Sequence, residues 1–315
     1  MKFGRNRPIA VHPHLKLGNY LRATLPAAPA TCDFTAKAAA VLADVYQNDA
    51  LGDCVVAGGY HVAGVETGNA GSAFHATPAQ IIADYSKIGG YVPGDPSTDN
   101  GADLQTALAY WSQTGFANGT KLLGYLSVDP TNKAEVQAAC WLFENLYIAL
   151  ELPDTYVNPF PSGNGFVWDV GTPNPQQGHC IMAAGYGTTG ITIGTWGMIG
   201  TLTYAALAAL CSHSGGGELW IMLTPDQLAK GASKAPNGVD WAGIVADFDS
   251  LGGHVPVPAP PAPPPPAPVP GAPTATLAQA EAWLAAGINA GSPLLTKARA
   301  IAEANAALAA KWPKS

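Results

Sequence analysis

The chain has 315 residues, long enough to bury a sizeable core, and only 12% of them are charged. With 36 glycines, 28 prolines and 48% hydrophobic residues, the composition is that of a loop-rich globular protein and excludes an intrinsically disordered one. The net charge is −7, and no stretch approaches the roughly 20 consecutive apolar residues that a membrane-spanning helix needs.

Positive charge is concentrated in the first 22 residues. They contain no acidic residue, and their basic residues are Lys2, Arg5, Arg7, Lys16 and Arg22, while the remainder has 10 basic against 22 acidic residues. Such an arm could bind nucleic acid or an acidic partner. Its basic residues do not alternate with aromatic ones, however, and Pro13 breaks any helix. We therefore expect an extended arm that lies on the chain's own acidic body, and we do not expect nucleic-acid binding.

The same arm does not have the form of a signal peptide, because Pro13 and charged flanks interrupt its apolar residues. We therefore expect no export through a standard signal. Five cysteines form an odd set without C-x-x-C spacing, which predicts no metal site and leaves at least one free thiol in a monomer. We expect the cysteines to be reduced and mostly buried.

A polar loop from Gln47 to Asp53 leads into a small apolar segment that begins with Cys54. Asp53 is then the N-cap of a helix, and Cys54 is its first residue. The positive end of a helix favours a thiolate, so we expect a lowered pKa and a nucleophilic sulfur. The alternative is that Cys54 is a small buried hydrophobic residue.

A second group of polar residues occurs 125 residues later. Two β-type segments flank residues 187–190, which predicts a hairpin with His179 at the start of one strand and Thr195 and Trp196 at the end of the next. Residues placed in this way share one edge of a sheet. They can act as a base and the group that orients it.

Other segments have clear local signals. Thr77-Pro78 predicts a capped helix, Asn132 and Glu135 predict the start of another, and residues 146–150 and 218–223 predict buried strands. An amphipathic helix is predicted through Leu104, Ala107, Leu108 and Trp111. Helices precede strands, so we expect an α+β body with a helical half and an antiparallel β half around a cleft.

These motifs resemble those of the papain-like cysteine peptidases. The family has a Gly-Ser-Cys turn, which Gly52-Asp53-Cys54 resembles, and a later histidine followed at a fixed offset by Gly-Tyr-Gly, which His179 and residues 185–187 match. Residues 99–102 and the helix after them resemble its Asn-Gly-Gly cleft wall. The match spans residues 24–223, and its details resemble a bacterial and phage-encoded branch.

The resemblance implies a set of catalytic residues. Cys54 would be the nucleophile, His179 the base and then the acid, Thr195 the residue that orients the imidazole, and Asn48 the donor to the oxyanion. Asn48 stands where the family has glutamine, with Gln47 one residue further out, and Thr195 stands where it has asparagine. Alignment on Trp196-Gly197 would instead place Gly194 at the asparagine position.

It also implies where substrate binds and what else is needed. The expected substrate-binding residues are Gln47, Asn100, Gly101, Leu104, Cys180 and Trp196. Leu104 and Cys180 resemble the family's second specificity pocket and indicate an apolar substrate side chain. No metal or cofactor is expected. About 30 residues precede the body, too few to fold as the family's inhibitory pro-segments, so we expect any latency to have another source.

The implied function is cleavage of peptide bonds in a peptide or protein substrate by a Cys-His thiolate. One alternative is a catalytically inactive papain-like scaffold, virion-associated, that acts through its C-terminal segment. The other is a cell-wall amidase or endopeptidase of a related Cys-His fold. The expected location is the cytoplasm or a virion.

Composition divides the chain into four expected parts: an arm at 1–30, a papain-like domain at 31–252, a Pro-rich linker at 253–275 and an Ala-rich helical hairpin at 276–315. The linker is expected to be a stiff polyproline II spacer, with an SH3-type ligand as the alternative. Leu294, Ile301 and Leu308 lie on one apolar seam of the hairpin. This predicts either self-association or docking to a larger assembly.

Overall fold

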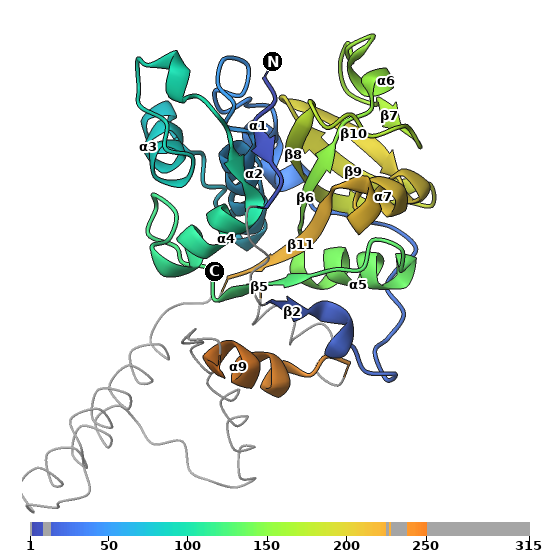
Figure 1. Ribbon diagram of the computed structural model, residues 1–315. Coiled ribbons are helices and arrows are strands. Elements are labelled where there is room, and N and C mark those ends of the chain that lie inside the picture. Colours follow the sequence, from blue (N-terminus) through green and yellow to red (C-terminus); the bar gives the residue numbers. More distant parts are fainter. Residues whose placement is uncertain (1, 9–13, 225–226, 228–237, 251–315) are drawn as a thin grey trace, which may run out of the picture. The chain divides into compact units, whose positions relative to one another are not determined.

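A computed structural model describes residues 2–8, 14–224, 227 and 238–250 of the chain (Figure 1). The expected linker at 253–275 and hairpin at 276–315 lie outside these residues. No helix in the described ranges is long and apolar enough to cross a bilayer.

Helices occupy mainly the first half of the described chain. The α-helices are α1 (Ala39–Leu42), α2 (Cys54–Ala70), α3 (Pro78–Ile88), α4 (Leu104–Gln113), α5 (Lys133–Phe143), α6 (Asp154–Val157), α7 (Tyr204–Leu210) and α9 (Trp241–Ser250). Short 3-10 turns are η1 (Leu17–Asn19), η2 (Ala36–Ala38), η3 (Pro96–Thr98) and η4 (His213–Gly215).

The longer strands occur later in the chain. The strands are β1 (Arg5–Asn6), β2 (Leu15–Lys16), β3 (Cys32–Asp33), β4 (Ala102–Asp103), β5 (Gly124–Ser127), β6 (Leu146–Glu151), β7 (Val167–Trp168), β8 (Gly178–Tyr186), β9 (Gly190–Thr195), β10 (Met198–Thr203) and β11 (Glu218–Leu223).

Within the described residues, nine of these strands form one sheet in the order β2-β5-β11-β6-β8-β9-β10-β7, with β3 paired to β8. Pairing is antiparallel except where the short outer strands β2 and β7 join it. The predicted hairpin is present, because β8 and β9 pair around residues 187–189. The predicted strand at 218–223 has the bounds of β11.

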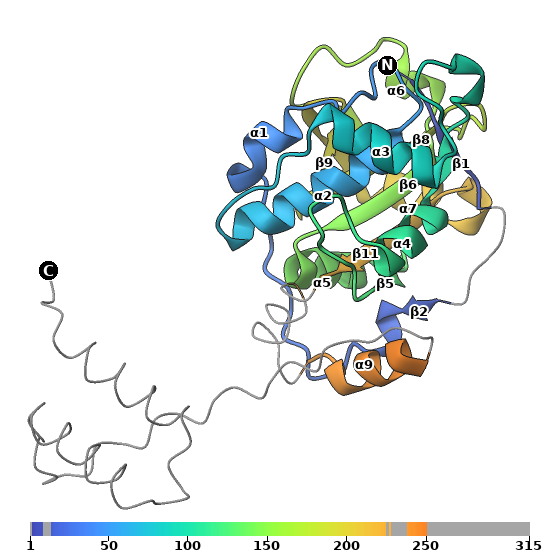
Figure 2. The ribbon, with the colours of Figure 1, turned by 90° about the vertical axis from the view of Figure 1, so that its left-hand side faces the viewer.

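Helices cover both faces of the central strands. Along β6, Leu146, Ile148 and Leu150 belong to one apolar cluster, whereas Tyr147 and Ala149 belong to another. This alternation follows from the two-residue period of a strand. The first cluster includes buried residues of α5 and α7, and the second includes those of α2, α3 and α4. Figures 1 and 2 show α2, α3 and α4 gathered on one side of the strands.

Local capping explains where the outer helices begin. Thr77 and Gln80 form a reciprocal capping box at the start of α3, and the Asn132 side chain accepts from the Glu135 N–H at the start of α5. Both starts were predicted. Helix α2 is instead mostly apolar and is buried along nearly its whole length, and only Thr67, Asn69 and Ala70 near its end are not buried.

Glycines allow the close packing of α2. A Cβ on Gly59 would lie 2.1 Å from the Trp111 ring, and one on Gly64 would lie 2.4 Å from Val41. His61 on this helix is buried, and its Nε2 is 2.9 Å from the Asp44 carbonyl oxygen. Close packing thus fixes α2, and with it Cys54, against the sheet.

The N-terminal arm adds a short second sheet. Strand β1 pairs in parallel with β4, with Arg5 opposite Ala102 and Asn6 opposite Asp103. Each strand has only two residues. This pairing draws the arm along the start of α4 and toward the first residues of β8.

Candidate active site

Cys54 is the first residue of α2, as predicted, and only 1% of it is exposed. Asp53 occupies the N-cap position, but its side chain makes no capping hydrogen bond. Both of its carboxyl oxygens are buried and have no partner with hydrogen-bonding geometry among the described residues. Burial raises the pKa of Asp53 well above its ordinary value, and the nearby Asn48 amide offsets only part of that effect.

His179 is held from two sides. Its Nε2 lies 2.8 Å from the Thr195 Oγ1, and its ring stacks on the Trp196 indole with 4.2 Å between centroids. Its Nδ1 is buried and has no partner among the described residues. Burial lowers the pKa of the imidazole to about 3. The side chain that contacts this ring nitrogen is therefore that of Thr195, whereas Gly194 has no side chain to do so.

Asn48 connects the nucleophile loop to the histidine. Its Oδ1 accepts from the Trp196 Nε1 at 2.7 Å, and its Nδ2 donates to the Leu51 carbonyl at 3.0 Å. The same Nδ2 lies 3.3 Å from the Lys2 carbonyl oxygen, at the long end of hydrogen bonding. The amide hydrogens of Asn48 can thus reach a carbonyl of the segment that covers the nucleophile loop.

The N-terminal arm covers this site. The Phe3 ring stands edge-on to the His179 ring at 6.2 Å between centroids, and the Gly4 backbone contacts the Cys54 thiol. Gly4 donates to the Gly178 carbonyl at 3.1 Å. Consecutive arm residues therefore touch the histidine and the cysteine.

The arm fits without room for a side chain at Gly4. A Cβ there would lie 1.8 Å from the Gly52 carbonyl oxygen, and Gly101 in turn lies against the Gly4 carbonyl. The Ala102 N–H donates to the same carbonyl at 2.8 Å. The backbone of the arm thus packs directly against the nucleophile loop and the segment before α4.

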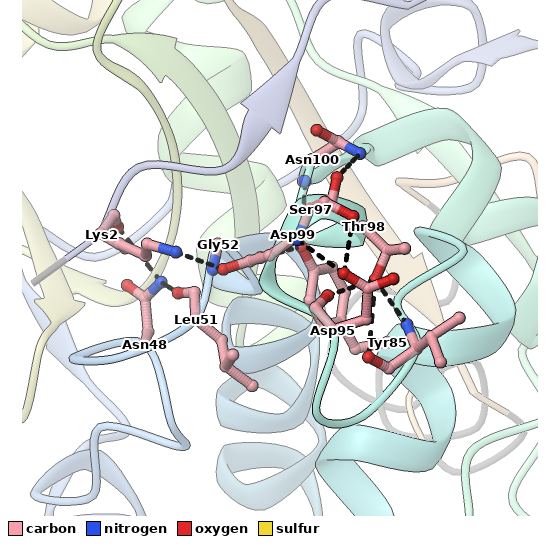
Figure 3. A network of polar contacts seen from close by, with 12 residues as sticks. Lys2, Asn48, Leu51, Gly52, Tyr85, Asp95, Ser97, Thr98, Asp99 and Asn100 are labelled. Carbon is pink, nitrogen blue, oxygen red and sulfur yellow. Dashed lines mark hydrogen bonds and ion pairs between the residues drawn. The ribbon is translucent and has the colours of Figure 1, made fainter.

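Ion pairs hold the arm in place. Lys2 pairs with Asp99, whose carboxylate also accepts from the Gly52 N–H at 2.9 Å and the Tyr85 hydroxyl at 2.6 Å (Figure 3). Arg5 pairs with Glu218 at 2.8 Å, and Arg7 pairs with Glu151 at 2.5 Å. The expectation that the basic arm lies on an acidic body is met for these three residues.

One expectation about the nucleophile needs correction. The pKa of Cys54 is raised to about 12 rather than lowered, because burial and the adjacent Asp53 outweigh the helix terminus. The arm was expected to be too short to fold as an inhibitory segment, and it lies against the thiol as extended backbone without a helix.

The expected substrate-binding residues are only partly at the surface of the cleft. Gly101 touches the arm, Asn100 accepts from the Asn6 side chain on its carbonyl at 2.9 Å, and Gln47 is half-buried in the nucleophile loop. Leu104 and Cys180 are 0% and 3% exposed and belong to the apolar cluster around α2. The charge of Arg5 acts on Cys180, and the apolar side chain expected in the substrate stays a prediction.

Glu218, Gln105 and Asp99 were not predicted as site residues. Glu218 begins a predicted strand, and Asp99 belongs to the segment that resembles a cleft wall, so the sequence places both in elements next to the site. Their partners, Arg5 and Lys2, come from the opposite end of the chain, and nothing local relates them. The five cysteines are all free thiols, and all but Cys32 are buried, as expected.

Solved structures resemble this fold. Xylellain, a cysteine protease from Xylella fastidiosa, aligns with a TM-score of 0.51 and 15% identity over 70% of this chain and 96% of that one. Digestive procathepsin L2 from Tenebrio molitor larval midgut gives 0.47 and 15% identity over 70% of this chain and 77% of that one.

Neither a family model nor a curated protein matches the chain. The alignment with xylellain covers nearly all of that protein. The chain has the papain-like α+β fold, as its motifs predict.

Proposed function

We propose that the chain is a cysteine peptidase whose nucleophile is Cys54 and whose base is His179. The observation that carries the proposal is the state of the imidazole. Its Nε2 is bound by Thr195 and its face by Trp196, while its buried Nδ1 has no partner among the described residues. A ring held in this way presents one free nitrogen, which is what a general base requires.

Each other group would have a defined role. His179 Nδ1 would take the thiol proton, and the thiolate sulfur would bond to the carbonyl carbon of the scissile peptide. The oxygen that becomes negative would accept from the Asn48 Nδ2 and the Cys54 backbone N–H. The imidazolium would then give its proton to the leaving amine, and water would release the acyl group.

The arm covers the proposed catalytic residues, so the structure corresponds to a closed form of the enzyme. With Phe3 and Gly4 in place, the thiol is buried and the histidine is neutral, so no thiolate–imidazolium pair forms. Displacing the arm would return both groups to water. It would remove the desolvation that raises the pKa of Cys54 and lowers that of His179. Activity would therefore depend on removal or release of residues 2–8.

Gly4→Ala tests the proposal without touching a catalytic group. The new methyl has no space beside Gly52, so it should expel the arm, whereas Gly163→Ala is a matched control because nothing lies within 4 Å of that position. The full chain is treated with a peptidyl epoxide or vinyl sulfone, and labelled thiols are mapped by mass spectrometry. We expect Gly4→Ala to label at Cys54 at least about tenfold faster than wild type or Gly163→Ala, and to cleave a peptide library.

A catalytically inactive scaffold is the second candidate. The observation that favours it is the burial of Cys54, together with the pKa of about 12 of its thiol. Neutral iodoacetamide separates the two functions, since it reports exposure alone. If Gly4→Ala exposes Cys54 to iodoacetamide but yields neither selective epoxide labelling nor peptide cleavage, the chain is a binding protein.

A further inference from the structure

The guanidinium of Arg5 occupies a buried polar pocket beside the proposed nucleophile. Its Nη1 donates to the Gly216 carbonyl at 2.7 Å, and its Nη2 donates to the Glu218 Oε1 at 2.8 Å. The Arg5 side chain is 1% exposed, and that of Glu218 is 13% exposed. The pocket is therefore largely closed to solvent and offers two acceptors to one planar group.

The protein fixes the acidic side of this pocket independently of the arm. The second carboxylate oxygen of Glu218 accepts from the Gln105 Nε2 at 2.7 Å, and Gln105 is itself buried on α4. Glu218 lies at the start of β11, where pairing with Ala149 of β6 sets its position. One carboxylate oxygen of Glu218 is thus bound by Gln105, and the other is bound by the guanidinium in the pocket.

The pocket is close to the reacting groups. The charge of Arg5 acts on the Cys54 thiol and lowers its pKa against the larger effect of burial. The Arg5 carbonyl lies against Gly178, where a Cβ would be 2.0 Å from that oxygen, and Gly178 directly precedes His179. A side chain in this pocket therefore belongs to a segment that passes over the proposed catalytic residues.

Removal of the arm would leave an acidic residue in a largely buried site without its cation. Arg7, the next basic residue of the arm, pairs with Glu151 instead. A buried carboxylate that loses its partner is costly, so the open pocket would favour another cation. A guanidinium can donate to both acceptors at once in a fixed planar geometry, whereas the ammonium of lysine is a single point charge on a flexible stem.

We infer that the pocket formed by Glu218, Gln105 and the Gly216 carbonyl is a specificity site for an arginine side chain of the substrate. This inference rests on the proposed peptidase function and names its substrate class as arginine-containing peptides. The arm, with Arg5 in the pocket, occupies that site in the closed form.

Binding tests the pocket without any turnover. The full chain carries Gly4→Ala and Arg5→Ala to open the cleft and empty the pocket, with Cys54→Ala to prevent cleavage. The probes are acetyl-Lys-Phe-Gly-X-Asn-Arg-amide peptides with X as Arg, Lys, Leu or Glu, measured by calorimetry. We expect the Arg peptide to bind about ten- to a hundredfold more tightly than the Leu peptide, and several-fold more tightly than the Lys peptide.

Glu218→Gln should reduce the preference for Arg over Leu to less than about threefold, because it keeps the shape of the pocket and removes its charge. Asp240→Asn is the matched control, since Asp240 pairs with Arg22 at the same kind of distance, 2.9 Å, on the exposed surface. It should leave the preference unchanged. Equal binding of the Arg and Leu peptides, or a preference that survives Glu218→Gln, overturns the inference.

Turnover separates this inference from the proposed function. With the Gly4→Ala, Arg5→Ala chain, we expect kcat/KM for library peptides to fall about tenfold or more when a single arginine is replaced by leucine. If kcat/KM is the same for the arginine and leucine peptides, the pocket is not a specificity site, but the proposed peptidase function stands. Tight, Glu218-dependent arginine binding without turnover of any peptide leaves the pocket and overturns the peptidase.

Discussion

The ring of His179 lies nearly parallel to the indole of Trp196, with 22° between the planes. Trp196 and Gly197 both have positive φ, at 49° and 73°, and they form the two-residue connection between the paired Thr195 and Met198. Two positive φ values suit the turn of a tight hairpin but are unfavourable for a bulky residue. The stack and the bond to Asn48 hold Trp196 in this conformation, so the turn that presents Thr195 also supports the imidazole.

Thr195→Val should lower kcat/KM of the arm-opened enzyme by about five- to thirtyfold. Valine keeps the volume and removes the acceptor for the His179 Nε2, a loss of about 1 to 2 kcal/mol of orientation. Thr195→Asn supplies an amide oxygen and should hold or raise activity. Thr192→Val on the same strand is the control, and an equal effect of both valine variants would exclude an orienting role for Thr195.

Trp196→Phe should destabilise the protein by about 1 to 3 kcal/mol. The phenyl ring can still stack on His179, but the Asn48 Oδ1 loses its donor while it remains buried. Adding Asn48→Leu removes the unpaired oxygen as well, so the two changes should be less than additive in urea unfolding. Additive losses would show that the bond between the two side chains contributes nothing.

Asp53→Asn should stabilise the chain at pH 7 by about 1 to 2 kcal/mol. The folded-state pKa of Asp53 is raised, so its contribution to stability is full at acid pH and is lost as the pH rises. An amide carries no such cost, and the advantage of the variant should vanish toward pH 4. Asp49→Asn, at the exposed neighbouring residue, should have no comparable effect in the same denaturant series.

Lowering the pH from 7 to 5 should destabilise the Asp53→Asn chain by about 1 to 2 kcal/mol for each of two histidines. Burial lowers the pKa of His61 to about 4 and that of His179 to about 3. A histidine in the unfolded chain has a pKa of about 6.5. Below that pH the unfolded chain binds protons that the folded chain excludes, so the free energy of unfolding decreases as the pH is lowered. Replacing either histidine by glutamine should flatten the slope between pH 7 and 5, and unchanged slopes would contradict the burial of the neutral rings.

A chain that ends at residue 258 should keep a single cooperative unfolding transition. The two apolar clusters of the described body are built from residues up to Val245, and the prolines of 255–273 favour an extended spacer. Calorimetry of the shortened and full chains checks this. A broadened transition or a loss of solubility in the shortened chain would place the boundary elsewhere.

Local signals were enough to predict much of the fold. Thr77 and Asn132 cap helices through bonds to residues three positions on, and β11 shows its strand pattern within six residues. The meeting of His179 and Thr195 was also predictable. It requires only one hairpin, since β8 and β9 are adjacent in both sequence and sheet.

The closed state of the site was not predictable in this way. Strands β1 and β4 have two residues each and are separated by nearly a hundred positions, so neither shows a pattern. The ion pair of Arg5 with Glu218 joins residues 213 positions apart. Since the burial of Cys54 depends on these contacts, the direction of its pKa shift could not be inferred from a helix start alone.

The partners of the arm also set an order of events during synthesis. Residues 2–7 leave the ribosome before their partners, because Glu151 and Glu218 follow about 10 to 40 seconds later at common elongation rates. Until then the arm has no complete binding surface, and neither does the sheet that carries His179. Strand β11 completes the centre of the sheet and also supplies the Glu218 carboxylate that binds Arg5. The site and the arm that covers it therefore form at the same stage of folding.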